Sequence, residues 1–247
     1  MIEITDQLLS KNRPFRKLTA LKAIIIHWTA NTNKGANALA NARYFNSDQY
    51  LTKKNGEKVK ISASAHYVVD DKQIIRCIPD DEVGYHVGSK SGYKELIYTE
   101  IGIPRSGRPN DYMIGIEMCV NSDSDFSVTR QNTIELTRYL LKAHNLTTAN
   151  VYRHYDITGK DCPKMMLDEE IWQQFKQEID YTTNDNNDTV KLRVNTATLN
   201  VRTGSGTNYL IKRKLNSGEI VRKIGQNGLW YQIGVDEWIH SSYVVVL

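Results

Sequence analysis

The feature that most restricts the fold is a continuous apolar run, Leu21–His27, that ends in a histidine. The run is short and rich in β-branched residues, so it predicts a strand that is buried on both faces. Met113–Val120 has the same character and carries a carboxylate, Glu117, near its middle. Strands of this kind belong to sheets with helices on both faces, which indicates an α/β domain.

The segments around these two runs agree with that class. Apolar residues recur at helical spacing and predict helices at Ala36–Tyr50, Ser127–His144 and Asp168–Ile179. Short apolar runs predict a hairpin made of Ala65–Val69 and Gln73–Ile78, and a further strand at Asn150–Tyr155. Because strands alternate with helices, we expect a mixed central sheet flanked by helices over residues 1–180.

The pattern changes after residue 180. Tyr181–Thr189 is polar and rich in Asn, Asp and Thr, which is typical of an interdomain linker. Residues 190–247 consist of short alternating runs between Gly- and Asn-containing turns and show no helical period. This part predicts a small all-β barrel of roughly five to seven strands. We therefore expect domains at 1–180 and 190–247, joined by a linker at 181–189.

The net positive charge of the chain is concentrated in the smaller domain. Residues 190–247 carry 8 Lys or Arg and 3 Asp or Glu, against 24 and 23 in residues 1–180. A short basic module favours an anionic partner such as a wall polymer, a membrane surface or a nucleic acid, although ordinary surface charge explains it equally well. The module shows no recognition helix and no RNA-binding sheet signature, so we do not expect it to bind nucleic acid.

The N-terminal residues and the cysteines indicate the compartment. MIEITDQLLSKNRPFRK contains no apolar core with a cleavage site, so we expect synthesis in the cytoplasm without a signal peptide. No apolar run near the start is long enough for a membrane span. The three cysteines are too few to suggest a disulfide scaffold. Cys77 and Cys119 lie in apolar segments and predict buried core residues, which leaves Cys162 available as a metal ligand.

A metal site is predicted from three residues. His154 and Cys162 are eight positions apart, with a Thr158–Gly159 turn between them that allows a loop to bring them together. His27 ends a buried strand, where a side chain can project into a cleft. Two imidazoles and one thiolate suit a single Zn²⁺ ion and leave a fourth position for water, whose pKa such a site lowers toward ~7. Taken alone, each histidine is more often a structural residue.

Two further residues fit chemistry beside this ion. A carboxylate within an apolar strand is costly unless it is paired or faces a cleft, so Glu117 is interpreted as a general base rather than a solvent-facing side chain. Lys160 stands two positions before Cys162. Its ammonium is interpreted as stabilising the oxyanion of a tetrahedral intermediate, and a solvated loop lysine is the alternative.

Four segments together resemble a known family, the type 2 N-acetylmuramoyl-L-alanine amidases, which share a fold with peptidoglycan recognition proteins. The segments are HWTA at His27–Ala30, SAHYVVDD at Ser64–Asp71, IGIEM at Ile114–Met118 and RHYDITGKDCP at Arg153–Pro163. The resemblance runs in order from about Ala23 to Ile179. It implies that residues 1–180 form a zinc amidase catalytic domain.

The resemblance implies a role for each matching residue. His27, His154 and Cys162 match the zinc ligands, Glu117 matches the acidic catalytic residue of one branch, and Lys160 matches the loop lysine beside the zinc. His66 and His86 fall where the family lines its substrate groove, and a structural role is the alternative for both. Two positions depart from the pattern. Ala65 replaces a catalytic Tyr of some members, which favours Glu117 as the base, and Lys164 replaces a common Gly.

The C-terminal domain resembles bacterial SH3-like wall-binding modules over Val190–Leu247. The segments that carry this resemblance are LNVRTG at Leu199–Gly204, LWYQI at Leu229–Ile233 and WIHSSY at Trp238–Tyr243. It implies binding to a cell-wall peptide or an anionic wall polymer. Trp230 and Tyr243 are the candidate contacts, although each ring fits a core position equally well.

The expected function is zinc-dependent hydrolysis of the amide bond between N-acetylmuramic acid and L-alanine in bacterial peptidoglycan. Two alternatives share the fold or the metal: a non-catalytic peptidoglycan receptor, whose silent members lack the cysteine ligand, and a zinc peptidase that cuts within the stem peptide. We expect action on the wall after release through a phage-made membrane pore, as in an endolysin. A bacterial autolysin exported by another route is the alternative.

Overall fold

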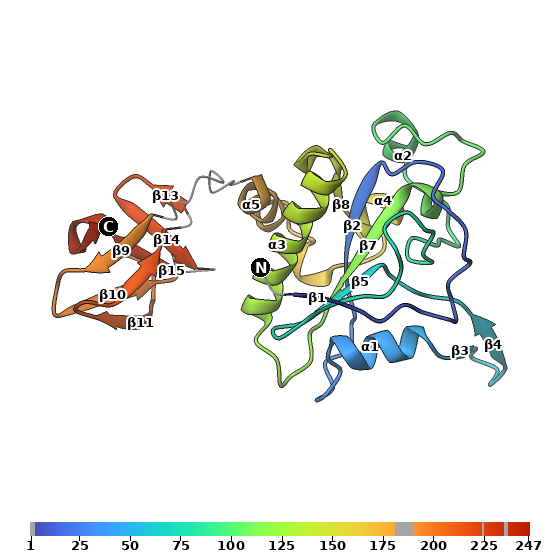
Figure 1. The fold of residues 1–247 in the computed structure, drawn as a ribbon, viewed down its shortest axis with the longest axis horizontal. Helices are drawn as coiled ribbons and strands as arrows, with labels where there is room; N and C mark the ends of the chain where they lie inside the picture. Colours follow the sequence, from blue (N-terminus) through green and yellow to red (C-terminus); the bar gives the residue numbers. More distant parts are fainter. Residues whose placement is uncertain (1–2, 181–189, 224, 235–236) are drawn as a thin grey trace. The chain divides into compact units, whose positions relative to one another are not determined.

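The computed structural model describes residues 3–180, 190–223, 225–234 and 237–247. It divides the chain into two compact units, Met1–Asp180 and Tyr181–Leu247, each of which we describe by itself (Figure 1). The linker predicted at 181–189 lies outside the described residues.

A six-stranded mixed sheet forms the centre of the first unit, in the order β1-β6-β5-β7-β2-β8. The strands are β1 (Ile4–Asp6), β2 (Ala23–Trp28), β5 (Tyr67–Val69), β6 (Ile74–Arg76), β7 (Met113–Met118) and β8 (Val151–Arg153). Only β5 and β6 pair in antiparallel fashion among these neighbours. The predicted α/β class, the mixed sheet, the two buried strands and the hairpin are confirmed.

Helices cover both faces of this sheet (Figure 1). α3 (Phe126–Ala143) and α5 (Glu169–Asp180) pack on one face, against alternate residues of the central strands such as Ile24 and Ile116. α1 (Ala38–Phe45), α2 (Leu96–Thr99) and α4 (His154–Thr158) pack on the opposite face. Short 3₁₀ turns lie at Pro109–Tyr112, Thr148–Asn150 and Lys164–Met166. Within the described residues, none of the helices has the length and apolar character needed to cross a bilayer.

The helix predicted at Ala36–Tyr50 is shorter than expected, because α1 ends at Phe45. Asn46 is the C-cap, and its side-chain oxygen accepts hydrogen bonds of 2.8 and 2.9 Å from two backbone N–H groups of the N-terminal segment. Tyr50 instead lies in β3 (Gln49–Thr52), which pairs with β4 (Lys58–Ile61) in a separate two-stranded sheet. The prediction of a helix through Tyr50 is therefore wrong.

The strand predicted at Asn150–Tyr155 is also shorter, because β8 ends at Arg153 and His154 begins α4. The backbone N–H and the guanidinium of Arg153 both donate to the Asp156 carboxylate, each at 2.8 Å. These bonds to a carboxylate in the first turn help to start the helix directly after the strand. The chain therefore changes direction at His154, the predicted metal ligand.

The second unit is built from short strands, as predicted, but its described residues form eight of them rather than five to seven. They are β9 (Lys191–Val194), β10 (Thr198–Arg202), β11 (Ile211–Asn216), β12 (Ile220–Arg222), β13 (Gly225–Asn227), β14 (Trp230–Gly234), β15 (Glu237–His240) and β16 (Val244–Val246). The described residues form a five-stranded sheet, β11-β10-β15-β14-β13, and a three-stranded sheet, β12-β9-β16, with a 3₁₀ turn at Ser241–Tyr243. Leu199 and Val201 face the apolar core, so the other residues of β10 point outward.

Candidate metal centre

The carboxyl ends of three neighbouring parallel strands carry the predicted site. β2 lies between β7 and β8. His27 on β2 is the register partner of Glu117 on β7, and Ile26 is the partner of Arg153 on β8, so His154 follows immediately beyond. Because side chains alternate along a strand, His27 and Glu117 lie on the same face of the sheet. Ligands of open α/β sheets bind at this end of the strands.

The loop after α4 returns Cys162 to this point. Gly159 ends the helix with a φ of +80°, a conformation that favours glycine and reverses the chain. The backbone N–H of Tyr155 then donates to the carbonyl of Cys162 at 2.9 Å. Arg153 ties the far side of the loop, since its guanidinium donates to the carbonyl of Met166 at 2.9 Å. A helical turn, a glycine and a buried arginine therefore bring Cys162 close to His154, eight positions earlier in the chain.

The three predicted ligands form one cluster. The ligand atoms of His27, His154 and Cys162 all lie within 4.8 Å of one another, and each residue is at most 3% exposed. His27 Nδ1 lies 3.6 Å from Cys162 Sγ. Zn–S and Zn–N bonds of about 2.3 and 2.1 Å at a tetrahedral angle place these two atoms about 3.6 Å apart. The observed separation therefore fits a shared zinc ion.

Unpaired polar atoms surround the cluster. Both ring nitrogens of His154 and Oε2 of Glu117 are buried and have no hydrogen-bond partner among the residues that the structure describes. Leaving a buried donor or acceptor unpaired costs about 1–3 kcal/mol. A cation bound between the ligands would be a partner for one of the unpaired nitrogens of His154.

The electrostatic environment also fits a metal. Burial lowers the pKa of His154 to about 4 and that of His27 well below its ordinary value, so both rings are neutral at neutral pH, as ligands must be. Burial raises the pKa of the Cys162 thiol to about 12. A thiolate at this position therefore requires a positive partner, and a bound cation supplies one.

The predicted base and cation lie beside the cluster. Burial raises the pKa of Glu117 to about 8, and the Lys160 ammonium opposes this shift. Lys160 also lowers the pKa values of His27 and His154, so its charge acts on the interior of the site although its side chain is exposed. The arrangement places a carboxyl that titrates near neutral pH beside a positive charge and three metal-binding side chains.

His66 and His86 are both buried close to the ligand cluster. His66 is fully buried; its Nδ1 accepts from the Gly115 N–H at 3.1 Å, and its Nε2 is 2.8 Å from the Glu82 carbonyl. His86 is 8% exposed and bonds through both ring nitrogens, to His27 and to the Met113 carbonyl. Both nitrogens of each ring have protein partners, which favours the structural alternative over substrate binding for both residues.

The environment of His66 makes stability depend on pH. Burial lowers its pKa to about 4 from an ordinary 6.5. The unfolded state therefore takes up a proton at a higher pH than the folded state does, so the contribution of His66 is fully present above pH 6.5 and is lost as the pH falls toward 4. We expect the melting temperature in chelator to fall across this window, and to fall less steeply in His66→Gln. Parallel curves for the two proteins would contradict this assignment.

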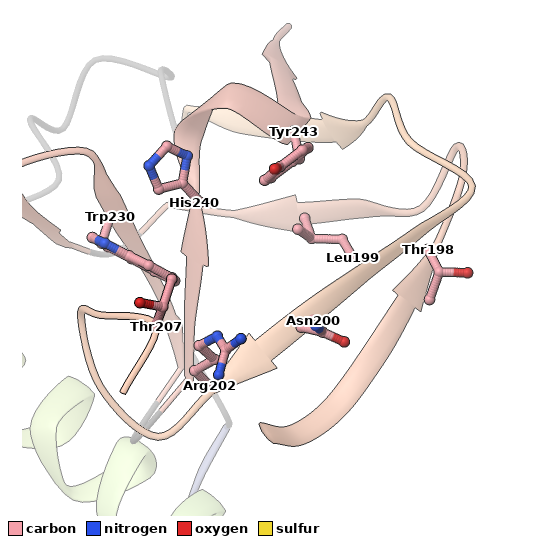
Figure 2. A pocket seen from close by; sticks show the side chains of 8 residues that line it. All are labelled: Thr198, Leu199, Asn200, Arg202, Thr207, Trp230, His240 and Tyr243. Carbon is pink, nitrogen blue, oxygen red and sulfur yellow. The ribbon is translucent and has the colours of Figure 1, made fainter. Parts of the chain in front are cut away.

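The aromatic residues predicted as wall contacts line a hollow of about 420 Å³ in the second unit. Its lining is Thr198, Leu199, Asn200, Arg202, Thr207, Trp230, His240 and Tyr243. Trp230 and His240 lie together at one end of the hollow and Thr198 lies at the other (Figure 2). The rings of Trp230 and His240 meet edge to face, with their centroids 5.2 Å apart. His240 and the outward residues of β10 are not among the predicted contacts, although the alternation in that strand is visible in the sequence.

Comparison with known proteins gives two matches. Residues 17–165 match a family described as N-acetylmuramoyl-L-alanine amidase, and residues 197–245 match the bacterial SH3 domain. The amidase match covers more than half of the chain and includes every predicted residue of the metal site. The second match covers all of the aromatic residues in the hollow, so the predicted SH3-like class of the second unit is confirmed.

Relatives agree with these matches. N-acetylmuramoyl-L-alanine amidase XlyA of Bacillus subtilis (strain 168) is 36% identical over 68% of this chain and 46% of its own length. N-acetylmuramoyl-L-alanine amidase CwlL of Bacillus licheniformis is 31% identical over 92% of this chain and 63% of its own length. The chain thus spans less than two thirds of either relative. A solved mutant endolysin from Bacillus subtilis has a TM-score of 0.57 and 34% identity, covering 72% of this chain and 99% of that one.

Proposed function

Since the chain belongs to the N-acetylmuramoyl-L-alanine amidase family, we propose that it hydrolyses the amide bond between N-acetylmuramic acid and L-alanine in bacterial peptidoglycan. One zinc ion would be held by His27, His154 and Cys162. The observation that carries the proposal is their buried cluster at the strand ends, beside the unpaired carboxyl oxygen of Glu117.

The protein residues divide the work of amide hydrolysis. When bound, zinc supplies Lewis-acid activation of water and of the carbonyl group. Glu117 accepts a proton from the attacking water and returns it to the leaving amine, a task suited to a carboxyl whose pKa is about 8. The Lys160 ammonium offers positive charge to the oxygen on which negative charge develops.

Digestion of purified peptidoglycan tests this function. We expect soluble stem peptides with a free L-alanine amine in the mass spectrum, loss of activity with a chelator, and recovery on adding zinc. Cleavage only within the stem peptide would show the alternative zinc peptidase. Wall binding without any released product would show the alternative receptor, against which the presence of Cys162 already argues.

We propose that the second unit holds the enzyme on the wall through the hollow that contains Trp230. Large rings beside polar side chains suit a cell-wall peptide or an anionic wall polymer, and Arg202 supplies one positive charge. We expect Trp230→Ala to weaken retention of the full chain on purified sacculi by about tenfold, since truncating a central aromatic contact commonly costs more than 1 kcal/mol.

Leu229→Ala is the matched control for this prediction. Leu229 is the neighbouring residue and is 64% exposed, but it does not line the hollow. Equal loss of retention in both variants would place the binding surface elsewhere. Competition with soluble stem peptide or with purified anionic polymer would identify which of the two wall components occupies the hollow.

We also propose that the chain reaches its substrate after release through a phage-made membrane pore. The likeness to an endolysin structure supports this proposal. Expression in host cells would lyse them only when a pore-forming protein is produced as well, whereas lysis without the pore would contradict it.

A further inference from the structure

His27 belongs to a line of hydrogen bonds that leads away from the ligand cluster. Its Nε2 lies 3.1 Å from His86 Nδ1, and His86 Nε2 lies 3.2 Å from the backbone carbonyl oxygen of Met113. The two rings are perpendicular, with centroids 5.2 Å apart. The line starts at a backbone atom of β7 and ends at a proposed metal ligand on β2.

The chemistry of the end groups fixes where each proton lies. A carbonyl oxygen only accepts, so His86 Nε2 must carry a hydrogen and donate to Met113. His86 is only 8% exposed, and a neutral ring has a single hydrogen, so with Nε2 protonated its Nδ1 is an acceptor. His27 Nε2 must then be the donor. A neutral His27 protonated on Nε2 has its lone pair on Nδ1, the atom that faces Cys162.

The cysteine side of the cluster agrees with this assignment. Cys162 Sγ lies 3.6 Å from His27 Nδ1. A buried thiol is a weak donor, and a ring nitrogen with a free lone pair is a suitable acceptor for it. The His86 side of the ring therefore requires this tautomer, and the Cys162 side is compatible with it.

We propose that the Met113 carbonyl, acting through His86, holds His27 in the Nε2-protonated tautomer and so directs its Nδ1 lone pair into the metal centre. His86 is thereby a positioning residue, not a substrate contact. The inference rests on the proposed function for the identity of the metal, but the tautomer itself does not depend on any ion. Outer partners of this kind fix ring orientation and raise the affinity of metal sites.

Gly115 makes room for this arrangement. A Cβ at this position would lie 2.7 Å from both Cγ and Nδ1 of His86, closer than real contacts allow. Gly115 sits within the buried strand β7, where a glycine weakens packing unless another group must approach the backbone. The approaching group is the His86 ring.

His66 packs against the His86 ring without bonding to either nitrogen of that ring. Its ring meets that of His86 edge to face, with centroids 5.5 Å apart. Its own Nδ1 is occupied by the Gly115 N–H and its Nε2 by the Glu82 carbonyl. His86 therefore keeps a single acceptor for the His27 proton.

Nitrogen-15 NMR of the full chain in chelator tests the tautomer directly. Long-range proton–nitrogen correlations distinguish Nδ1–H from Nε2–H rings. We expect the Nε2–H pattern for both His27 and His86 in the zinc-free protein. An Nδ1–H pattern for His27 would overturn the inference.

Zinc affinity, measured by competition with a chromophoric chelator, tests the consequence. We expect His86→Leu, which removes the acceptor, to weaken zinc binding by about 10–100-fold. His86→Asn keeps an acceptor near the Nδ1 position and should lie closer to the wild type. Gly115→Ala, which displaces the ring without removing a donor or acceptor, should resemble His86→Leu. Unchanged affinity in His86→Leu, or equal losses in the Leu and Asn variants, would overturn the inference.

Thermal unfolding in chelator provides the control for folding. Variants that melt cooperatively in the zinc-free state report on the metal centre rather than on loss of structure. Failure of the proposed function is distinguishable, because a wild-type chain that binds no zinc refutes the metal centre whatever the tautomer. If the chain binds zinc, but His27 is protonated on Nδ1 in the metal-free form, only the inference about the line of hydrogen bonds is refuted.

Discussion

Replacing Glu117 with glutamine is expected to lower the turnover of purified peptidoglycan by about 10²–10⁴-fold, the usual contribution of a general acid–base group. The substitution keeps the shape of a partly buried side chain but removes its capacity to accept a proton. The substitution changes none of the three proposed ligands, so the variant should bind one zinc ion with the affinity of the wild type. Turnover measured beside metal content separates these two effects.

Glu170→Gln is the matched control, since Glu170 is an exposed carboxylate at the start of α5. It should leave both turnover and zinc content unchanged. Loss of zinc from Glu117→Gln would contradict the role assigned to Glu117 and make it part of the metal-binding set. Full activity in that variant would mean that another group carries the proton.

Replacing Cys162 with serine is expected to remove zinc and activity together. Changing an outer partner of a metal ligand costs about 10–100-fold in affinity, so loss of one of three ligands should cost at least about 100-fold. The hydroxyl cannot replace the thiolate, whose charge offsets that of the ion. Competition with a chromophoric chelator gives the affinity, and excess zinc should restore only part of the activity.

Cys77→Ala serves as the control for this second prediction. Cys77 is as buried as Cys162 but lies in an apolar cluster packed with α1. Its replacement should reduce stability through lost packing while leaving zinc affinity intact. Equal loss of zinc from both variants would indicate a general effect on folding rather than loss of a ligand.

Much of the first unit could be predicted because its signals are local. Continuous apolar runs identify β2 and β7, and their buried positions follow from composition alone. The three ligands could be chosen from residue type, since imidazoles and a lone available thiol suggest zinc. Their meeting point could not be derived from spacing, because it depends on β2 lying between β7 and β8 in the sheet.

The remainder depends on contacts between distant segments. Asn46, the C-cap of α1, is bonded to the N-terminal segment 36 residues away, which no helical period records. His86 is 59 positions from His27, and its role rests on which ring nitrogen meets a backbone carbonyl. A sequence motif that places a histidine near a site does not say whether the ring faces substrate or supports a ligand from beneath.

The zinc K-edge X-ray absorption spectrum of the full chain, loaded with one equivalent of zinc, tests the metal centre most directly. The account predicts one sulfur scatterer at about 2.3 Å together with nitrogen or oxygen scatterers at about 2.0–2.1 Å, in four-coordinate geometry. A spectrum without sulfur, or one with six oxygen neighbours typical of a loosely held ion, would contradict it.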